Sequence, residues 1–282
     1  MSADTSSAVA DTLVGLEATT QWQEELYKHL HRNPELSFEE VETRAEIVRR
    51  LQSYGFETQE IGGGVVGVLA NGEGRTVLFR ADMDALPVTE NTGLEYASTK
   101  PGVMHACGHD AHVTSALGAA ELLSQNRATW SGTYIALFQP AEELSTGAQA
   151  MVDDGLVDKV PTPTVCLSQH VLTAPEAGHI GTTAGPVLSA GDSIKVTVFG
   201  KGSHGSMPHL GIDPVVLAAT IVVRLQTIVA RVLAPSEFGV VTVGSIQAGT
   251  KANIIPDHAV LLLNVRTYDN GVRDRVLEAI ER

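Results

Sequence analysis

The feature that most constrains the fold of this chain is a repeated change between two hydrophobic periods. Short runs rich in β-branched and aromatic residues alternate with longer segments whose apolar residues recur at helical spacing. This alternation is typical of α/β proteins, in which helices cover a largely buried sheet. We therefore predict an α/β fold, and 282 residues are enough for two domains.

The N-terminal part is expected to build most of this α/β layer. Helical spacing extends from about Ala8 to His31, and the capping box at Ser37–Glu40 predicts a second helix that ends near Leu51. Two β-rich runs, 65–70 and 76–80, are separated by Asn-Gly-Glu-Gly, which predicts a hairpin. The next expected elements are a helix at 112–123, a strand at 132–139, a helix at 147–153 and a buried strand at 164–171.

A second unit is predicted where the pattern changes near residue 185. Its expected elements are a strand at 193–199, a helix at 213–231, strands at 240–247 and 258–266, and a helix at 272–281. This order matches a ferredoxin-like β-α-β-β-α-β unit without its last strand, so we expect the chain to be part of a longer protein. We assign 1–185 to a metal-binding catalytic domain and 186–282 to a smaller, incomplete domain.

Charge and hydropathy exclude several classes of partner. The formal net charge is −14, and a chain this acidic repels the phosphates of nucleic acids. The first ten residues do not resemble a signal peptide, and no apolar run approaches the roughly 20 residues that span a bilayer. We therefore expect a cytoplasmic protein with neither a nucleic-acid nor a membrane partner.

The most informative cluster is His105–His112, with the sequence HACGHDAH. Thiolate and imidazole groups at such close spacing are preferred ligands of zinc-like ions, and no second cysteine pair follows to make a zinc finger. The alternative is that Cys107 is a nucleophile with a histidine as base. Nearby carboxylates argue against it, because they would raise the pKa of the thiol. Cys166 is expected to be a small buried residue of its apolar strand.

Carboxylates follow two of the predicted strands, where α/β proteins build their sites. In Glu142 and Glu143, one glutamate could bind a metal while its neighbour takes a proton from water; the alternative is a solvated pair opening a helix. Asp82 and Asp84 could bind metal, orient a ligand histidine or form a turn before a proline. His170, at another strand end, could add a ligand.

Two glycine-rich segments require separate interpretations. Residues 200–209 do not form a phosphate loop, because Gly202 rather than Ser or Thr follows Lys201, and His204 in this turn could reach a substrate. Residues 62–67 match G-x-G-x-x-G formally, but they lead into a strand rather than a helix. We therefore predict no nucleotide site in either segment.

The motifs NPELSFEE, FRADMDALPVTE, HACGHDAH, QPAEE, SQHV, GSHGSMPHLGIDP and GTKANIIPD occur in order along nearly the whole chain. Together they resemble the aminoacylase, hippurate hydrolase and auxin-conjugate amidohydrolase family of dinuclear metallohydrolases, with bacterial N-acyl-glutamine aminoacylases as the nearest likeness. The resemblance implies a zinc-peptidase-like α/β/α catalytic domain with an inserted ferredoxin-like α+β lid domain.

The resemblance also implies a ligand set. Cys107 corresponds to the ligand that bridges two divalent metal ions, and His109, Glu143 and His170 correspond to further ligands. Zinc is the expected metal, with manganese, cobalt or nickel as alternatives.

The resemblance implies catalytic roles for neighbouring carboxylates. Glu142 corresponds to the general base that later protonates the leaving amine. Asp84 belongs to the catalytic set, and Asp82, which stands where related peptidases carry a ligand histidine, is expected to support the ligands from outside.

In the lid, the resemblance gives His204 the role of stabilising the oxyanion, often from the partner subunit. Asn253 and Arg266 correspond to residues that hold the substrate and its carboxylate. The implied function is metal-dependent hydrolysis of N-acyl amino acids by a homodimer that associates through the lid. Two alternatives remain: a dipeptidase or carboxypeptidase of the same mechanism, and a catalytically impaired metal-binding fragment, since family members continue into a segment that supplies another ligand histidine.

Overall fold

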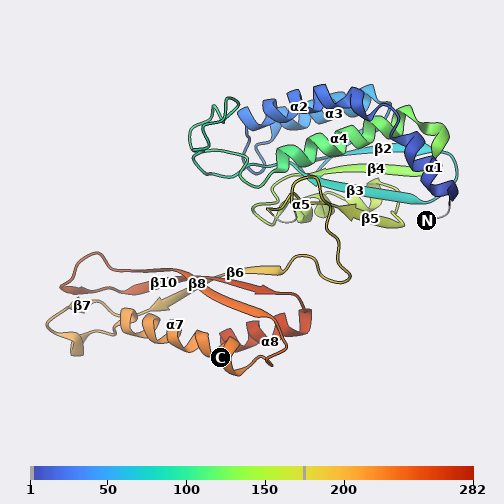
Figure 1. Cartoon of the computed structure of the whole chain (residues 1–282). Coiled ribbons are helices and arrows are strands. Elements are labelled where there is room, and N and C mark those ends of the chain that lie inside the picture. Colours follow the sequence, from blue (N-terminus) through green and yellow to red (C-terminus); the bar gives the residue numbers. More distant parts are fainter. Residues whose placement is uncertain (1–2, 174–175) are drawn as a thin grey trace. The chain divides into compact units, whose positions relative to one another are not determined.

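The computed structural model describes residues 3–173 and 176–282 (Figure 1). The chain divides into two compact units, Met1–Ala174 and Pro175–Arg282, each with its own sheet and hydrophobic core. The assignment of a catalytic function to 1–185 and a lid function to 186–282 stays a prediction.

Within residues 3–173 the strands form a five-stranded mixed sheet in the order β1-β2-β4-β3-β5. The strands are β1 (Glu57–Ile61), β2 (Gly64–Asn71), β3 (Thr76–Asp82), β4 (Gly132–Gln139) and β5 (Val165–Ser168). β2 runs antiparallel to β1 and β4, whereas β3 runs parallel to both β4 and β5. The carboxyl ends of β3, β4 and β5 therefore meet at one edge of the sheet.

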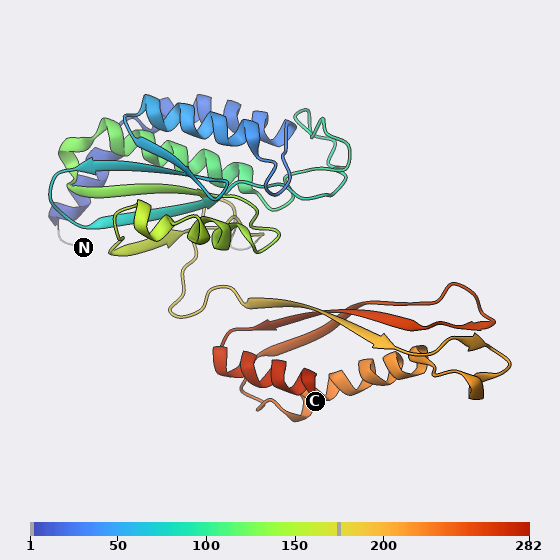
Figure 2. The same cartoon turned by 180° about the vertical axis from the view of Figure 1, so that it is seen from behind.

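Helices cover both faces of this sheet, as the two opposite views show (Figures 1 and 2). One face carries α2 (Leu16–Arg32), α3 (Val41–Ser53) and α4 (His109–Gln125), and the other carries α5 (Gly147–Asp153). The remaining helices of this unit are α1 (Ala3–Thr12), α6 (Leu156–Lys159) and the short 3-10 helix η1 (Arg127–Thr129). The larger core includes the fully buried Leu51, Leu117 and Phe138, and a smaller core on the opposite face includes Ile135 and Met151.

Two predictions about the N-terminal unit are wrong. The single helix from Ala8 to His31 is two helices, because Gly15 adopts a φ of 96° and interrupts the helical backbone. The expected hairpin between β2 and β3 does not form, because β4 lies between these strands. The hairpin instead joins β1 to β2, and its turn at Gly62 and Gly63 has φ values of 55° and 85°.

Two further predictions about this unit are wrong. The strand at 164–171 is shorter, lies at the sheet edge and is exposed along its whole length, so Cys166 is exposed rather than buried. The segment Ser37–Glu40 is no capping box, because α3 begins at Val41 without a side-chain cap.

Within residues 176–282 the long strands form a three-stranded antiparallel sheet in the order β6-β10-β8. Two helices cover one face of it (Figure 1). The elements are β6 (Ala190–Phe199), α7 (Pro214–Arg231), β8 (Gly239–Ala248), β10 (His258–Thr267) and α8 (Asn270–Glu281), with a small pair, β7 (Ser203–His204) and β9 (Ile254–Ile255), and the 3-10 helix η2 (Pro208–Leu210). The predicted β-α-β-β-α order is present, and the short pair β7–β9 was not predicted.

Among the described residues, α7 is a helix long and apolar enough to cross a membrane by length and composition, with 18 residues and a mean hydropathy of 1.5. This differs from the expectation that no apolar run approaches that length. Its buried residues Ala218, Leu225 and Ile228 belong to the core of the second unit, so packing on the sheet accounts for part of its apolar character.

Candidate metal centre and active site

Ligand-type side chains converge where β3, β4 and β5 end. Cys107 precedes α4, His109 is the first residue of α4, the glutamate pair follows β4 and His170 follows β5. The Cys107 Sγ lies 3.5 Å from the His170 Nε2. The ligand atoms of Cys107, His109 and His170 lie within 4.8 Å of one another, and so do those of His109, Glu142 and Glu143. The sheet thus brings a thiol, two imidazoles and two carboxylates together.

The His109 ring is fully buried and its orientation is fixed by the main chain. Its Nδ1 donates a hydrogen bond of 2.8 Å to the carbonyl oxygen of Asp84. Its Nε2 is buried without a hydrogen-bond partner in the described part of the chain, and lies 3.9 Å from carboxylate oxygens of both Glu142 and Glu143. An imidazole held in this way presents its free nitrogen to a cation.

The charges around the His109 ring favour a positive charge there. Burial alone would lower the pKa of His109, but its hydrogen bond to Asp84 and the charges of Asp82, Asp84 and Glu143 outweigh burial and raise it. The Nε2 position is therefore one that a cation would occupy favourably.

His170 is oriented in the same manner. Its Nδ1 donates a hydrogen bond of 2.6 Å to the carbonyl oxygen of Val171, which leaves Nε2 facing Cys107. Both histidines thus use a main-chain carbonyl to direct the other ring nitrogen into the same pocket.

The surroundings of Cys107 suit a cation ligand better than a nucleophile. Burial and the neighbouring carboxylates of Glu143, Glu142 and Asp82 raise the pKa of the thiol to about 12. A nucleophilic cysteine needs a lowered pKa, whereas binding to a cation itself removes the thiol proton. The structure therefore disfavours the Cys-nucleophile alternative.

The glutamate pair sits on a tightly wound turn after β4. Ala141 has a φ of 45°, and a Cβ at Gly147 would lie 1.6 Å from the carbonyl oxygen of Pro140. The turn is held from outside by Asp84, whose carboxylate accepts hydrogen bonds of 3.1 Å from the main-chain N–H groups of Glu142 and Glu143. Asp84 therefore fixes where both glutamates point.

Two residues of the misread capping box also support this turn. Ser37 donates a hydrogen bond of 2.7 Å to Asp84 Oδ2, and Glu40 Oε1 accepts one of 2.9 Å from the Ala141 N–H. Glu40 is fully buried, and burial raises its pKa. The residues that suggested a helix cap therefore support the turn that bears Glu142 and Glu143.

The two glutamates differ in exposure. The Glu143 side chain is 20% exposed, and its buried Oε1 has no hydrogen-bond partner among the described residues, whereas the Glu142 side chain is 40% exposed. Burial raises the pKa of Glu143. Unpartnered atoms on His109 and Glu143, together with a thiol and a second imidazole, form a donor set that fits a divalent metal.

In the second unit, His204 and Asn253 lie at the same end. His204 pairs with Ile254 across β7 and β9, and the Gly205 N–H donates to the Asn253 carbonyl oxygen at 2.7 Å. The His204 Nδ1 accepts a hydrogen bond of 3.2 Å from the Ser206 N–H. A neutral ring must therefore carry its proton on Nε2 and can donate it to a ligand.

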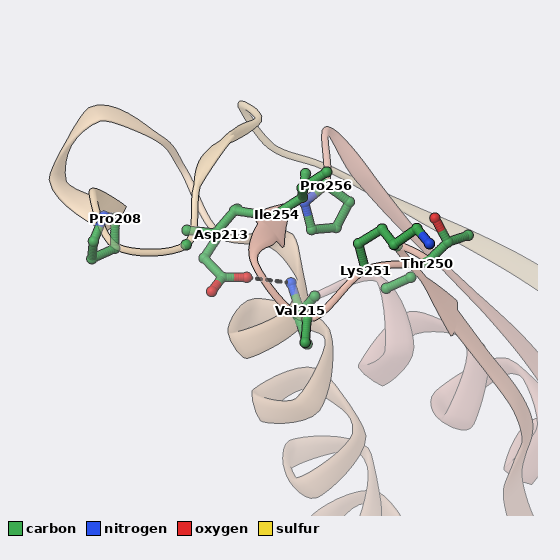
Figure 3. Close-up of a pocket in the computed structure, with 12 residues that line it drawn as sticks. Pro208, Asp213, Val215, Thr250, Lys251, Ile254 and Pro256 are labelled. Atoms are coloured by element: carbon green, nitrogen blue, oxygen red, sulfur yellow. Dashed lines mark hydrogen bonds between the residues drawn. The ribbon is translucent and has the colours of Figure 1, made fainter.

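A hollow of about 620 Å³ opens beside this end of the unit, between the start of α7 and the loop after β8 (Figure 3). Its lining includes Gly205, Lys251 and Ile254. The carboxylate of Asp213 borders it and accepts a hydrogen bond of 2.8 Å from the Val215 N–H, so it caps α7 (Figure 3).

Arg266 lies near the C-terminal end of β10 in the three-stranded sheet, whereas His204 belongs to the separate β7–β9 pair. Arg266 is exposed, its Nε donates a hydrogen bond of 3.0 Å to Asn264 Oδ1, and its register partner on β6 is Gly191. Arg266 lies eight positions along β10 from His258, which corresponds to about 27 Å of extended strand. His258 follows β9 closely in the chain, so one copy of this unit does not bring Arg266 to His204 and Asn253.

Residues 78–272 match the sequence model of peptidase family M20/M25/M40. This chain belongs to that family. N-acetyl-L-cysteine deacetylase of Bacillus subtilis is 42% identical over 252 residues, which are 88% of this chain and 60% of that protein. N-acyl-L-amino acid amidohydrolase of Geobacillus stearothermophilus is 40% identical over 259 residues, 90% of this chain and 69% of that protein. This M20 chain therefore spans about 60 to 69% of the length of these two relatives.

Solved structures agree with the family assignment. An aminohydrolase from methicillin-resistant Staphylococcus aureus superposes with a TM-score of 0.85 at 35% identity, over 97% of this chain and 70% of that one. A dinuclear metal-binding M20 peptidase from Bacillus subtilis superposes with a TM-score of 0.75 at 35% identity, over 94% and 69% of the two chains. The resemblance and the α/β fold class predicted from the motifs are confirmed.

Proposed function

We propose that this M20 chain hydrolyses the amide bond of N-acyl amino acids, with two divalent metal ions held by Cys107, His109, Glu143 and His170. One observation carries the proposal: the Nε2 atoms of two main-chain-oriented histidines lie in one cluster with a thiol and a glutamate pair. The names of the deacetylase and amidohydrolase relatives support this substrate class, and the dinuclear B. subtilis structure supports two ions.

The residues present divide the chemistry between them. Divalent ions bound here would supply a Lewis acid for the amide carbonyl and lower the pKa of water. Glu142, the more exposed glutamate, takes a proton from the attacking water and returns it to the leaving nitrogen. Asp84 acts by holding Glu142 in place, and Asp82 acts from behind the ligands. Thiolate and imidazole ligands favour zinc, with manganese, cobalt and nickel as alternatives.

The second unit supplies groups for substrate. We assign to the His204 Nε2–H the stabilisation of the oxyanion, to Arg266 the binding of the substrate carboxylate, and to Asn253 a further substrate contact. Because Arg266 lies at the opposite end of its unit from the other two, we propose a homodimer through this unit. One copy would supply Arg266, and its partner would supply His204 and Asn253.

The test is hydrolysis of N-acetyl amino acids by the purified chain after chelation and after addition of zinc, manganese or cobalt. We expect activity only with metal. Activity that survives chelation and disappears on thiol alkylation would overturn the proposal. Binding of metal without turnover of any substrate would support the impaired metal-binding alternative. A cytoplasmic location stays a prediction, and so does the lack of membrane and nucleic-acid partners.

A second substrate class is favoured by one comparison. Thermostable carboxypeptidase 2 of Saccharolobus solfataricus is 39% identical over 267 residues, 93% of this chain and 67% of that protein. A peptidase would use the same residues on a free dipeptide or peptide C-terminus. Comparing kcat/KM for dipeptides with that for N-acetyl amino acids of the same C-terminal residue separates the two functions.

A further inference from the structure

His112 is a buried histidine to which the proposed reaction assigns no role. Among the described residues it belongs to a group with Asp82 and His109 whose ligand atoms all lie within 4.8 Å of one another. All three side chains are buried. Distance alone would make this group a second place for a metal ion, so the hydrogen bonds of His112 have to decide its role.

The first of these hydrogen bonds joins His112 to Asp82. Asp82 Oδ2 accepts a hydrogen bond of 2.6 Å from Arg80, and Oδ1 lies 2.5 Å from the His112 Nδ1. Arg80 thus faces one oxygen of the Asp82 carboxylate and His112 faces the other, so Asp82 can accept a hydrogen bond from each of them.

The second hydrogen bond joins His112 to the main chain. The N–H of Val171 donates to the His112 Nε2 at 2.9 Å, which requires a lone pair on that nitrogen. His112 is therefore a neutral ring with its proton on Nδ1, and both nitrogens are already used. No lone pair is left for a metal ion.

The Val171 contact acts directly on the neighbouring ligand His170. The carbonyl oxygen of Val171 accepts the hydrogen bond from the His170 Nδ1. The rings of His112 and His170 also pack edge to face, with centroids 4.6 Å apart. The Val171 side chain also lies so close to Gly108 that a Cβ there would be 2.2 Å from it. Gly108 stands between Cys107 and His109, so the segment that carries His170 rests on the segment that carries the other ligands.

We infer that His112 is a positioning residue: it links Asp82 to the main chain at Val171 and so holds His170 against Cys107, without binding metal itself. The inference rests on the proposed metal centre, and it predicts which ring nitrogens respond when metal binds. The NMR signal of Nε2 shifts in a histidine that binds the metal, whereas a positioning histidine keeps its tautomer and its signals.

The direct test is nitrogen NMR of the chain labelled with ¹⁵N-histidine, recorded before and during a zinc titration. We expect His112 to show the Nδ1–H tautomer in both states, while the Nε2 signals of His109 and His170 shift. A zinc-induced shift at the His112 Nε2 of the same size as theirs would make it a ligand and overturn the inference. This readout does not depend on turnover, so it stands or falls separately from the proposed hydrolysis.

Two substitutions separate the hydrogen bonds of His112. In His112→Gln, the amide oxygen can take the place of Nε2 and accept the Val171 N–H. In His112→Asn, the shorter amide reaches only Asp82. Zinc affinity, measured by competition with a chromophoric chelator, should fall about 10- to 100-fold in the Asn variant and recover in the Gln variant.

Either of two results would contradict the inference. If both variants lose zinc equally and bind fewer equivalents, His112 is a ligand. If both keep the wild-type affinity while the Tm falls, its role is in stability alone. The NMR experiment on the unchanged chain decides the question if a variant does not fold.

Discussion

The proposed metal ligands of the first unit and the proposed substrate-binding residues of the second unit differ in how they are positioned. His109 is 0% exposed and directed by a main-chain carbonyl, whereas His204 is exposed and held by the adjacent Ser206. The main chain that carries Glu142 and Glu143 donates two hydrogen bonds to Asp84, whereas Arg266 contacts a neighbour on its own strand. Of the proposed ligands His109 is buried and the other three are partly buried, whereas the groups proposed to meet a substrate are more accessible.

The two units also differ in whether one copy of the chain brings all of its proposed site residues together. The groups of the pocket lie within a few ångströms of one another in one unit, so this part of the site needs one copy of the chain. The proposed substrate groups lie at two ends of their unit, so they can serve one site only in combination with a second copy. The four predictions below test this difference, in order of decreasing effect.

The largest effect is expected for Glu142→Gln, which removes the proton acceptor and keeps the shape. We expect kcat to fall about 10²- to 10⁴-fold while zinc content stays at the wild-type level, because Glu142 is assigned to proton transfer rather than to metal binding. Steady-state kinetics with N-acetyl amino acids and elemental analysis measure the two quantities. An unchanged kcat would remove Glu142 from this role.

Cys107→Ser tests the pocket itself. Replacing the thiol by a hydroxyl removes a direct ligand, so zinc affinity should fall by more than the roughly 10- to 100-fold typical of an outer hydrogen-bond partner. The matched control is Cys166→Ser, since Cys166 is exposed on β5. Chelator competition on both variants gives the comparison, and equal losses in the two would refute a ligand role for Cys107.

Mixing two inactive variants tests whether copies share a site. His204→Ala and Arg266→Ala should each have strongly reduced kcat/KM. When they are mixed and allowed to exchange subunits, a two-fold dimer would regain about a quarter of wild-type activity, because half of the dimers contain one intact site.

The control for the mixture is the same experiment with two variants that cannot complement each other, His204→Ala and Asn253→Ala, whose residues lie at the same end of the unit. No recovery in the Arg266 mixture, with exchange verified by mass, would mean that one copy supplies both groups.

The smallest effect is expected in the stability of the metal-free protein. Asp82 has a folded-state pKa of about 2 against an ordinary 3.8, so its ionised form stabilises the fold by roughly 2 kcal/mol. Because the folded pKa is the lower one, this stabilisation is present above about pH 4 and is lost as the pH falls towards 2. Asp82→Asn should therefore be less stable than wild type at pH 6, and the difference should shrink with acidification.

Urea unfolding at several pH values measures this difference. Asp158→Asn is the control, because Asp158 is exposed on α6. A gap between Asp82→Asn and wild type that stays constant from pH 6 to 2.5 would show that the charge of Asp82 is not what stabilises the fold.

Most elements of the fold were predictable because their hydrophobic period is strong. α4, β4 and α5 lie where spacing placed them, within a few residues. Strand order was not predictable, because a short connection between β2 and β3 looks the same whether or not a later strand inserts between them. The position of β4 between β2 and β3 depends on tertiary packing, and the residues of the local turn give no information about it.

The residues that could bind metal were predictable from the sequence, whereas the residues that hold them in place were less so. Cys107 is conspicuous because it lies in a dense cluster of histidines before a helix, and the glutamate pair because it follows a strand. Glu40 was interpreted as part of a helix cap and His112 only as a member of the histidine cluster, because what they do depends on contacts with main-chain atoms of Ala141 and Val171, far away in the chain. A hydrogen bond to the main chain can be made to a residue of any type, so the sequence holds no signal for it.

That main-chain support has a consequence for mutational change. The carbonyl oxygens that orient His109 and His170 belong to the backbone at Asp84 and Val171, so no substitution of a side chain deletes them. Substitutions that leave these two peptides in place should therefore leave both rings in their present orientation, whereas a side chain such as His112 matters because it holds the peptide at Val171. What would misdirect them is a shift of the peptide itself, so insertions and deletions near these two positions should be far more damaging than point changes.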